Sequence, residues 1–302
     1  MVVAFHGWLL GAPVTDSPYR AALRTTVQSR LTGANEAVAV DAPEAPPAEG
    51  RREPRLLRPF QSADGRSEAA RPPRASIKLE EVSKVYPNGK TALNDVDLVV
   101  PEGDFVFLVG PSGAGKSTLI KLLVHDEEAT HGIVQVAGHD LSRMKRGDIP
   151  KLRRQIGIVF QDFKLLPRKT VRENVSFALE VTGTPRRQIR STVDRVLALV
   201  GLTDQVNQRP GQLSGGEQQR TAIARAMVHD PRLIIADEPT GNLDPLISWE
   251  IIQLLLRIND LGTTVMMATH NAEVVTALRK RVVALEAGRI VRDEVGGYHR
   301  DY

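Results

Sequence analysis

Residues 110–118 read GPSGAGKST, and their first residue, Gly110, ends the apolar stretch FVFLVG at 105–110. They fit the pattern G-x-x-x-x-G-K-[ST], in which glycines let the backbone wrap closely around phosphate oxygens. The apolar stretch predicts a strand buried on both faces of a parallel sheet, and KSTLIKLLV predicts a helix immediately after the glycines. Because a helix N-terminus also favours anions, this context predicts a nucleotide phosphate site.

Two side chains of this loop have distinct expected roles. We expect Lys116 to reach the β- and γ-phosphates and Ser117 to hold Mg²⁺. The full set of predicted nucleotide contacts in the loop is Gly110, Pro111, Ser112, Gly113, Ala114, Gly115, Lys116, Ser117 and Thr118.

A pair of carboxylates supports the same chemistry. The stretch LIIADEP at 233–239 is an apolar strand pattern that ends in Asp237 and Glu238. Phosphoryl transfer needs charge neutralisation and an oriented nucleophile. We predict that Asp237 binds Mg²⁺ through water and that Glu238 polarises the attacking water.

Strand and helix patterns alternate along the chain from residue 77. An antiparallel pair is predicted first, and apolar runs then predict the strands of a parallel, doubly wound α/β sheet. The predicted strands are 77–86, 93–100, 105–110, 133–138, 156–160, 233–237 and 264–270, followed by a hairpin over 282–293. The predicted helices lie at 116–124, within 171–200, and at about 217–228, 246–260 and 271–278.

Composition changes near residue 75 of the 302 residues. Residues 1–75 contain ten Arg and no Lys, and DAPEAPPAEGRREPR at 41–55 is too polar and proline-rich to form a core. We therefore predict a disordered N-terminal extension and a folded domain over 76–302. The extension is a dispensable linker, the product of a start assigned too far upstream, or a regulatory tail.

Bulk properties exclude several classes of function. The chain has no cysteine, which excludes disulfides, thiol nucleophiles and cysteine metal sites. It has no run of about 18 apolar residues, so no membrane-spanning helix is predicted. The net charge is only +4 and no basic stripe alternates with aromatic residues, so we expect no nucleic-acid partner.

Residues 213–220, LSGGEQQR, indicate the class of protein. Ser214, Gly215 and Gly216 precede a helix expected to begin near Glu217, which makes a second anion-binding helix start. Since the chain already has one phosphate loop, a second such start suggests a second protomer. The stretch resembles the signature of ABC-type ATPases, which caps ATP held on the partner's phosphate loop. Many members carry Gln where this chain has Glu217, and because both residues can cap a helix we expect the exchange to be tolerated.

The other elements of this family follow in order. The resemblance implies that Gln161 contacts Mg²⁺ and the attacking water, that Asp244 of GNLD belongs to the D-loop, and that His270 contacts the γ-phosphate. Tyr86 resembles the aromatic residue on which adenine stacks, an interaction of about 1–3 kcal/mol. The implied fold is a P-loop NTPase of ABC type, with a parallel core sheet, an N-terminal antiparallel β subdomain and a helical subdomain over about 162–228.

Longer stretches resemble the FtsE family of cell-division ATPases within this class. They are QDFKLLPRKTVRENVSFALEVTG (161–183), LSGGEQQRTAIARAMVHDPRLIIADEPTGNLDP (213–245) and SWEI (248–251). The resemblance implies a homodimer that sandwiches two ATP and Mg²⁺ at the cytoplasmic face of the cell membrane. It also implies an integral membrane partner like FtsX, through which the ATPase controls peptidoglycan hydrolases.

We expect that partner to dock near residues 162–175, beside Lys164, Arg168 and Lys169, which we expect to be exposed. The main alternative is the ATPase subunit of a transporter of the lipoprotein-release or macrolide-efflux type. Chromosome-maintenance ATPases need a long coiled coil between the two motifs, and about 100 residues leave no room for one. Ribosome-acting relatives usually carry two ATPase domains, whereas one is found here. A scaffold that binds ATP without hydrolysis is disfavoured by Glu238 and His270.

Overall fold

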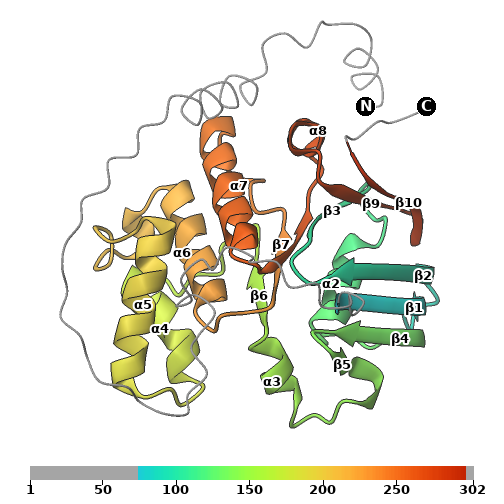
Figure 1. The fold of residues 1–302 in the computed structure, drawn as a ribbon, viewed down its shortest axis with the longest axis horizontal. Coiled ribbons are helices and arrows are strands. Elements are labelled where there is room, and N and C mark those ends of the chain that lie inside the picture. The colour runs from blue at the N-terminus through green and yellow to red at the C-terminus, as the bar shows by residue number, and fades with distance from the viewer. Residues whose placement is uncertain (1–73, 297–302) are drawn as a thin grey trace, which may run out of the picture. The chain divides into compact units, whose positions relative to one another are not determined.

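The structure, a computed structural model, describes residues 74–296. The predicted extension over 1–75 therefore lies almost wholly outside the described residues. The first layer is an antiparallel sheet in the order β2-β1-β4-β5 (Figure 1). Its strands are β1 (Ala75–Val85), β2 (Thr91–Pro101), β4 (His131–Val136) and the short β5 (His139–Asp140).

The second sheet has six strands in the order β10-β9-β3-β8-β7-β6. All neighbouring strands in it run parallel except β10, which pairs antiparallel with β9. Its strands are β3 (Phe105–Val109), β6 (Ile156–Val159), β7 (Leu233–Asp237), β8 (Thr264–Ala268), β9 (Arg281–Glu286) and β10 (Arg289–Val295). Every residue of β3 and β8 is buried, as the continuous apolar runs predicted.

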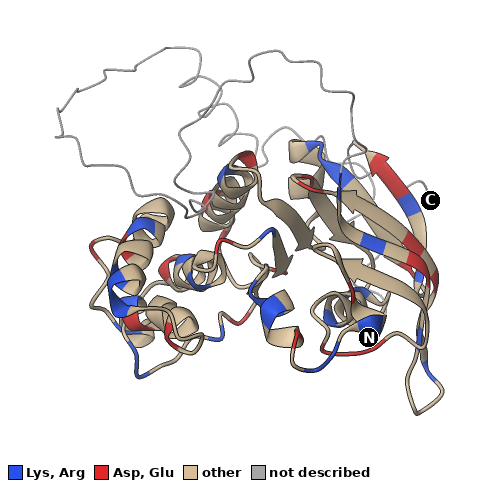
Figure 2. Ribbon diagram, turned by 60° about the horizontal axis from the view of Figure 1, so that its bottom comes forward, with Lys and Arg blue, Asp and Glu red and all other residues tan. Residues whose placement is uncertain are grey.

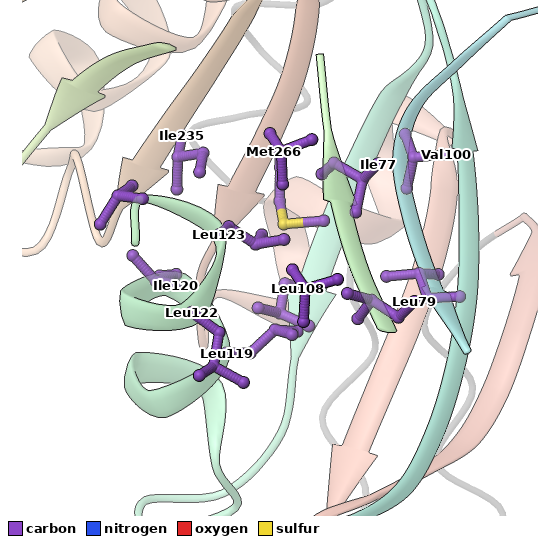
Figure 3. Close-up of a cluster of buried hydrophobic side chains, with 14 of the residues drawn as sticks. Ile77, Leu79, Val100, Leu108, Leu119, Ile120, Leu122, Leu123, Ile235 and Met266 are labelled. Atoms are coloured by element: carbon purple, nitrogen blue, oxygen red, sulfur yellow. The ribbon is translucent and has the colours of Figure 1, made fainter. Parts of the chain in front are cut away.

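Helix α2 (Lys116–Leu123) joins the two sheets through one hydrophobic core (Figure 3). Leu119 and Leu123 of this helix share that core with Leu108 and Met266 of the parallel sheet and with Leu79 of the antiparallel sheet. Burying each such side chain contributes about 1.5–3 kcal/mol. The helix start, which carries the glycine motif, is thereby fixed where the two sheets meet.

Three helices form the helical part of the fold, at the left of Figure 1: α4 (Val171–Glu180), α5 (Arg186–Val200) and α6 (Gly215–Met227). They pack on one another, and α6 also packs on β6. That contact is close, since a Cβ at Gly157 would lie 2.7 Å from Ala226 O. The remaining helices are α3 (Ile149–Arg153), α7 (Pro245–Asp260) and α8 (Ala272–Leu278).

The predicted strands and helices are confirmed, with small differences at their ends. Helix α6 begins at Gly215, two residues before the predicted start, because Ser214 caps it and both glycines enter the first turn. The sequence patterns missed the five-residue α3 and the two-residue β5, which are too short to show a period. Among residues 74–296, no helix combines the length and apolar character needed to cross a bilayer.

Candidate functional site

The glycine loop lies between the C-terminal end of β3 and the start of α2. Gly110 has φ 149°, and a Cβ there would lie 2.1 Å from Leu285 O of β9. Gly115 caps α2 with φ 112°, and its Cβ would lie 2.6 Å from Ala92 O. Both positions therefore require glycine, since the loop passes so close to the backbone of both sheets.

Lys116 folds back over the loop that precedes it. Its Nζ donates hydrogen bonds to Gly110 O at 2.6 Å and to Pro111 O at 3.1 Å. The ammonium group is thus held at the mouth of the loop, where it is available to an anion.

A cavity of about 560 Å³ opens over this loop, within the usual size range of small-molecule sites. It brings together most of the predicted site from five parts of the chain. Its lining residues are Tyr86, Lys90, Ala92, Gly110, Pro111, Ser112, Gly113, Gly115, Lys116, Ser117, Thr118, Gln161, Asp237, Glu238 and His270. Lys90 and Ala92 were not predicted, because no motif distinguishes them.

Glu238 follows β7 in a strained conformation. Its φ of 47° lies in the left-handed region, which a residue with a side chain adopts at a cost of about 1–3 kcal/mol. Its backbone N–H donates to Ala268 O at 3.0 Å, which ties it to β8. Its carboxylate Oε2 lies 2.9 Å from Nδ1 of His270, whose side chain is 74% exposed while that of Glu238 is 17% exposed. Glu238 thus lies on the inner side of the cavity edge and His270 on the solvent side.

Asp237 lies beside Glu238 at the C-terminal end of β7, where it is half-buried. Burial raises the pKa of Asp237, the charge of Glu238 raises it further, and the charge of Lys116 lowers it. The ionised carboxylate of Asp237 is therefore not fully compensated by nearby positive charge. A hard divalent cation would supply that charge, and Mg²⁺ prefers oxygen ligands such as those of Asp237, Ser117 and Gln161. All three residues line the cavity, so they fit a Mg²⁺ site.

Gln161 is held by the segment that follows Glu238. Its Nε2 donates to Asn242 Oδ1 at 3.4 Å, and Asn242 Nδ2 donates to Gln161 O at 3.2 Å. Gly241 lies against the same side chain, because a Cβ there would be 2.7 Å from Gln161 Nε2. Sequence reasoning placed GNLD in the D-loop but did not predict this contact with Gln161.

Tyr86 lies beside the glycine loop. Its hydroxyl is 3.3 Å from Oγ1 of Thr118, and Lys84 Nζ lies 5.2 Å from the centre of its ring. The ring therefore lines the cavity next to the loop that precedes α2, where an aromatic group could cover a base.

The signature residues do not join this cavity. Ser214, Gly215, Gly216, Glu217 and Asp244 are absent from its lining, and Ala114 is buried beneath the loop. Ser214 and Glu217 form a capping box: Glu217 N–H donates to Ser214 Oγ at 3.3 Å, and Glu217 Oε2 accepts from Ser214 N at 2.8 Å. Asp244 caps α7 by accepting from the N–H groups of Leu246 and Ile247.

Comparison with known proteins adds three findings. Residues 93–241 match the family described as ABC transporter. The chain is 56% identical over 221 residues to the cell division ATP-binding protein FtsE of Streptococcus pneumoniae, covering 73% of this chain and 96% of that protein. It is 54% identical over 226 residues to FtsE of Bacillus subtilis, covering 75% of this chain and 99% of that protein.

Among solved structures, the fold is similar to a dimeric, post-hydrolysis state of the ATP-binding cassette MJ0796 bound to ADP and Pi. The TM-score is 0.65 at 36% identity, and the match covers 72% of this chain and 98% of that one.

Proposed function

The chain belongs to the ABC transporter family of ATPases and, within it, to the FtsE group, and from this premise we propose that its ATP hydrolysis drives a membrane partner in cell division. The enzyme is an ATP hydrolase of ABC type. The observation that carries the proposal is the cavity itself, which gathers the phosphate loop, two carboxylates and His270 but leaves the signature outside.

The active unit in this proposal is a head-to-tail homodimer. Each cavity lacks Ser214 to Glu217 of its own chain, so a second copy would supply them to complete the nucleotide sandwich. The capped start of α6 presents backbone N–H groups suited to a phosphate. The similarity to a dimeric cassette supports this arrangement.

The residues of the cavity divide the reaction among them. Backbone N–H groups of the glycine loop and Lys116 bind the phosphates of ATP, and Tyr86 covers the base. Glu238 accepts a proton from the attacking water, and His270 holds the Glu238 carboxylate in place. Mg²⁺, which Ser117, Gln161 and Asp237 would hold, neutralises charge on the phosphates when bound. Gln161 also lies where it can orient the water.

The partner is an integral membrane protein like FtsX, which would hold the ATPase at the cytoplasmic face of the membrane. The proposed docking segment is 162–175. Lys164 and Arg168 are exposed there, and Lys164 pairs with Asp162 at 2.6 Å. Lys169 was expected to be exposed but is half-buried, with Nζ 5.6 Å from the ring centre of Phe177.

The docking segment is held in place by a buried side chain, Asn174, and a half-buried one, Arg225. Asn174, at the base of α4, donates to Leu166 O, Lys169 O and Thr170 O. The guanidinium of Arg225 on α6 donates to the carbonyl oxygens of Phe163 and Lys164. A rigid segment loses little conformational entropy on binding, which favours docking.

Figure 2 shows Lys and Arg positions in blue on the helices at its left, which form the helical part. A cleft adjoins the docking segment there. It has a volume of about 880 Å³ and lies between α4 and α5. Its lining holds three basic residues, Arg172, Arg186 and Arg190, and one acidic residue, Glu180, so its net positive charge suits an acidic segment of the partner.

Charge reversal tests the docking segment. Lys164→Glu together with Arg168→Glu should abolish recruitment to membranes that contain the partner, while ATP binding is retained. Normal recruitment of the double variant would place the docking site elsewhere.

A pull-down tests the function as a whole. Tagged Glu238→Gln protein should retain ATP without hydrolysing it, and it should recover an FtsX-like protein and division components from native membranes only when ATP and Mg²⁺ are present. Recovery of a permease with a substrate-binding protein would instead assign the chain to transport of the lipoprotein-release or macrolide-efflux type. Recovery of no membrane protein would reject both functions.

A further inference from the structure

Gln219 lies on α6, five residues after the Ser214 cap, and is fully buried, with 0% of the residue exposed. Its Nε2 donates a hydrogen bond to Pro239 O at 2.7 Å, across to the residue after Glu238. Its Oε1 is buried and accepts no hydrogen bond from any residue within 74–296. A buried acceptor without a partner costs about 1–3 kcal/mol, so an apolar residue would suit this position better if packing were its only role.

The hydrogen bond acts on the strained part of the backbone. Glu238 has φ 47°, and a turn follows it in which Gly241 N–H donates to Glu238 O at 3.1 Å. On the N-terminal side, Glu238 is fixed by its hydrogen bond to Ala268 O. On the C-terminal side, the bond from Gln219 holds the Pro239 carbonyl. A left-handed residue persists only where its surroundings hold it on both sides.

The same face of α6 touches this segment at two further points. A Cβ at Gly215 would lie 3.0 Å from Leu243 Cδ2, and one at Gly216 would lie 2.6 Å from Ile247 Cγ2. The signature glycines and Gln219 therefore contact one continuous stretch, from Pro239 to Ile247. The two glycines make apolar contacts, and Gln219 adds a directional bond to them.

We propose that Gln219 is a positioning residue for hydrolysis. Its buried amide holds the backbone after Glu238 against α6 and so fixes the position of the Glu238 carboxylate. The proposal rests on the role of Glu238 given above. Gln219 does not line the cavity, so it acts through Pro239. Because a displacement of about 1 Å in a reacting group can reduce the rate about 100-fold, loss of this bond should lower kcat rather than nucleotide affinity.

Exchange of the amide for a carboxyl group gives a specific signature of the bond. In Gln219→Glu, the protonated carboxyl group can donate to Pro239 O, whereas the ionised form presents only acceptors to that carbonyl. Burial raises the pKa of such a group above its ordinary value. The activity of this variant, relative to the wild type, should therefore rise as the pH falls.

The two cations of α6, Arg220 and Arg225, already have partners, so the introduced carboxyl group would find no free cation on this helix. Asp237 at the end of β7 is an acid and supplies none. Arg225 on α6 is engaged with the docking segment. The other pairs on α6, α7 and the β7 end are Glu217 with Ser214, Arg220 with Glu250, and Glu238 with His270.

The test uses the full chain and measures steady-state ATPase activity and the Kd of a fluorescent ATP analogue. Gln219→Met, which keeps the volume but removes the donor, should lower kcat about 10-fold to 100-fold at every pH with Kd changed less than about 2-fold. Gln219→Glu should recover by at least about 5-fold relative to the wild type between about pH 8.5 and about pH 6. Equal kcat in all three proteins would overturn the proposal.

Asn259→Asp is the matched control. Asn259 is a buried amide on α7 that donates to Gly103 O and Thr263 O, at the opposite end of the parallel strands from the cavity. If this variant shows the same recovery in acid, the effect in Gln219→Glu reflects general destabilisation and the proposal fails. Glu238→Gln is measured in parallel. Full activity in that variant would reject the catalytic role of Glu238, whereas an inactive Glu238→Gln with normal Gln219 variants would reject only the role of Gln219.

Discussion

Asp237 and Glu238 place two carboxyl groups side by side at the end of β7, and the pKa of Asp237 is raised by burial and by the Glu238 charge. A raised carboxyl pKa contributes stability that is fully present below the pKa of the unfolded chain and is lost as the pH rises through the folded value. The nucleotide-free protein should therefore be less stable at neutral pH than it would be without this charge.

Asp237→Asn tests this effect. At about pH 8 the variant should unfold at a higher temperature than the wild type, by about 2 °C for each kcal/mol gained in the free energy of unfolding. This difference in Tm should shrink toward about pH 4. Scanning fluorimetry without nucleotide and with a chelator measures it. A difference in Tm that does not depend on pH would contradict the prediction, while loss of ATPase activity in the variant is expected from its place in the cavity.

Gly241→Ala tests the contact that holds Gln161. The new Cβ would meet Gln161 Nε2 at 2.7 Å, and because this is the flexible end of a side chain, Gln161 should swing away instead of the fold breaking. We expect kcat to fall about 10-fold with Tm nearly unchanged. Gly147→Ala is the control, since a Cβ there meets no atom of the described part of the chain within 4 Å. Normal kcat in Gly241→Ala would show that the contact does not position Gln161.

These residues also show what the sequence could reveal. Lys116, Asp237 and His270 follow apolar strands in recognisable motifs, and the structure brings them to one cavity. Gln219 and Asn242 lie within the stretches LSGGEQQR and GNLD, but their own importance depends on single contacts, with Pro239 O and with Gln161. Such contacts join segments distant in sequence and leave no periodic pattern, so they could not be predicted.

The N-terminus of α6 is closed by a capping box whose contribution to stability can be tested. Its capping box uses Glu217, which accepts from both the N–H and the hydroxyl of Ser214 at 2.8 Å. A Gln side chain offers a carbonyl oxygen in the same place, so Glu217→Gln should change the free energy of unfolding by less than about 0.5 kcal/mol. Glu217→Ala removes the acceptor and should cost about 1 kcal/mol.

Urea unfolding of the three proteins measures both values. Thr170→Ala, which removes the matching capping box of α4, provides a second helix for comparison and should cost a similar amount. If Glu217→Gln destabilises as much as Glu217→Ala, the carboxylate charge contributes more than its hydrogen bonds do.

Helices and strands in which apolar residues form a long run or a regular repeat could be predicted from the sequence, and short elements could not. The buried strands β3, β7 and β8 are continuous apolar runs, and α7 repeats apolar residues at helical spacing. Helix α3 has five residues, including Pro150, and shows no such repeat. The pairing of β4 with β1 also depends on a return of the chain after α2, which strand patterns alone do not specify.

The separation of the signature from the cavity makes a prediction about the assembled enzyme. If Ser214 of one copy completes the site built on Lys116 of another, a variant defective in each should complement the other. Lys116→Ala removes the phosphate contact, and Ser214→Asp keeps an N-cap while placing a negative charge where phosphate would bind. Each variant alone should be nearly inactive.

An equal mixture of the two variants should recover about a quarter of the wild-type ATPase activity, since half of the randomly paired dimers then hold one intact site out of two. Mixing Lys116→Ala with Glu238→Gln is the control, because both residues line the cavity of a single chain and no pairing restores a complete site. Recovery in the first mixture alone requires a site shared between two copies. Failure of both mixtures, in protein that still dimerises with ATP, would mean that the signature does not act on the partner's nucleotide.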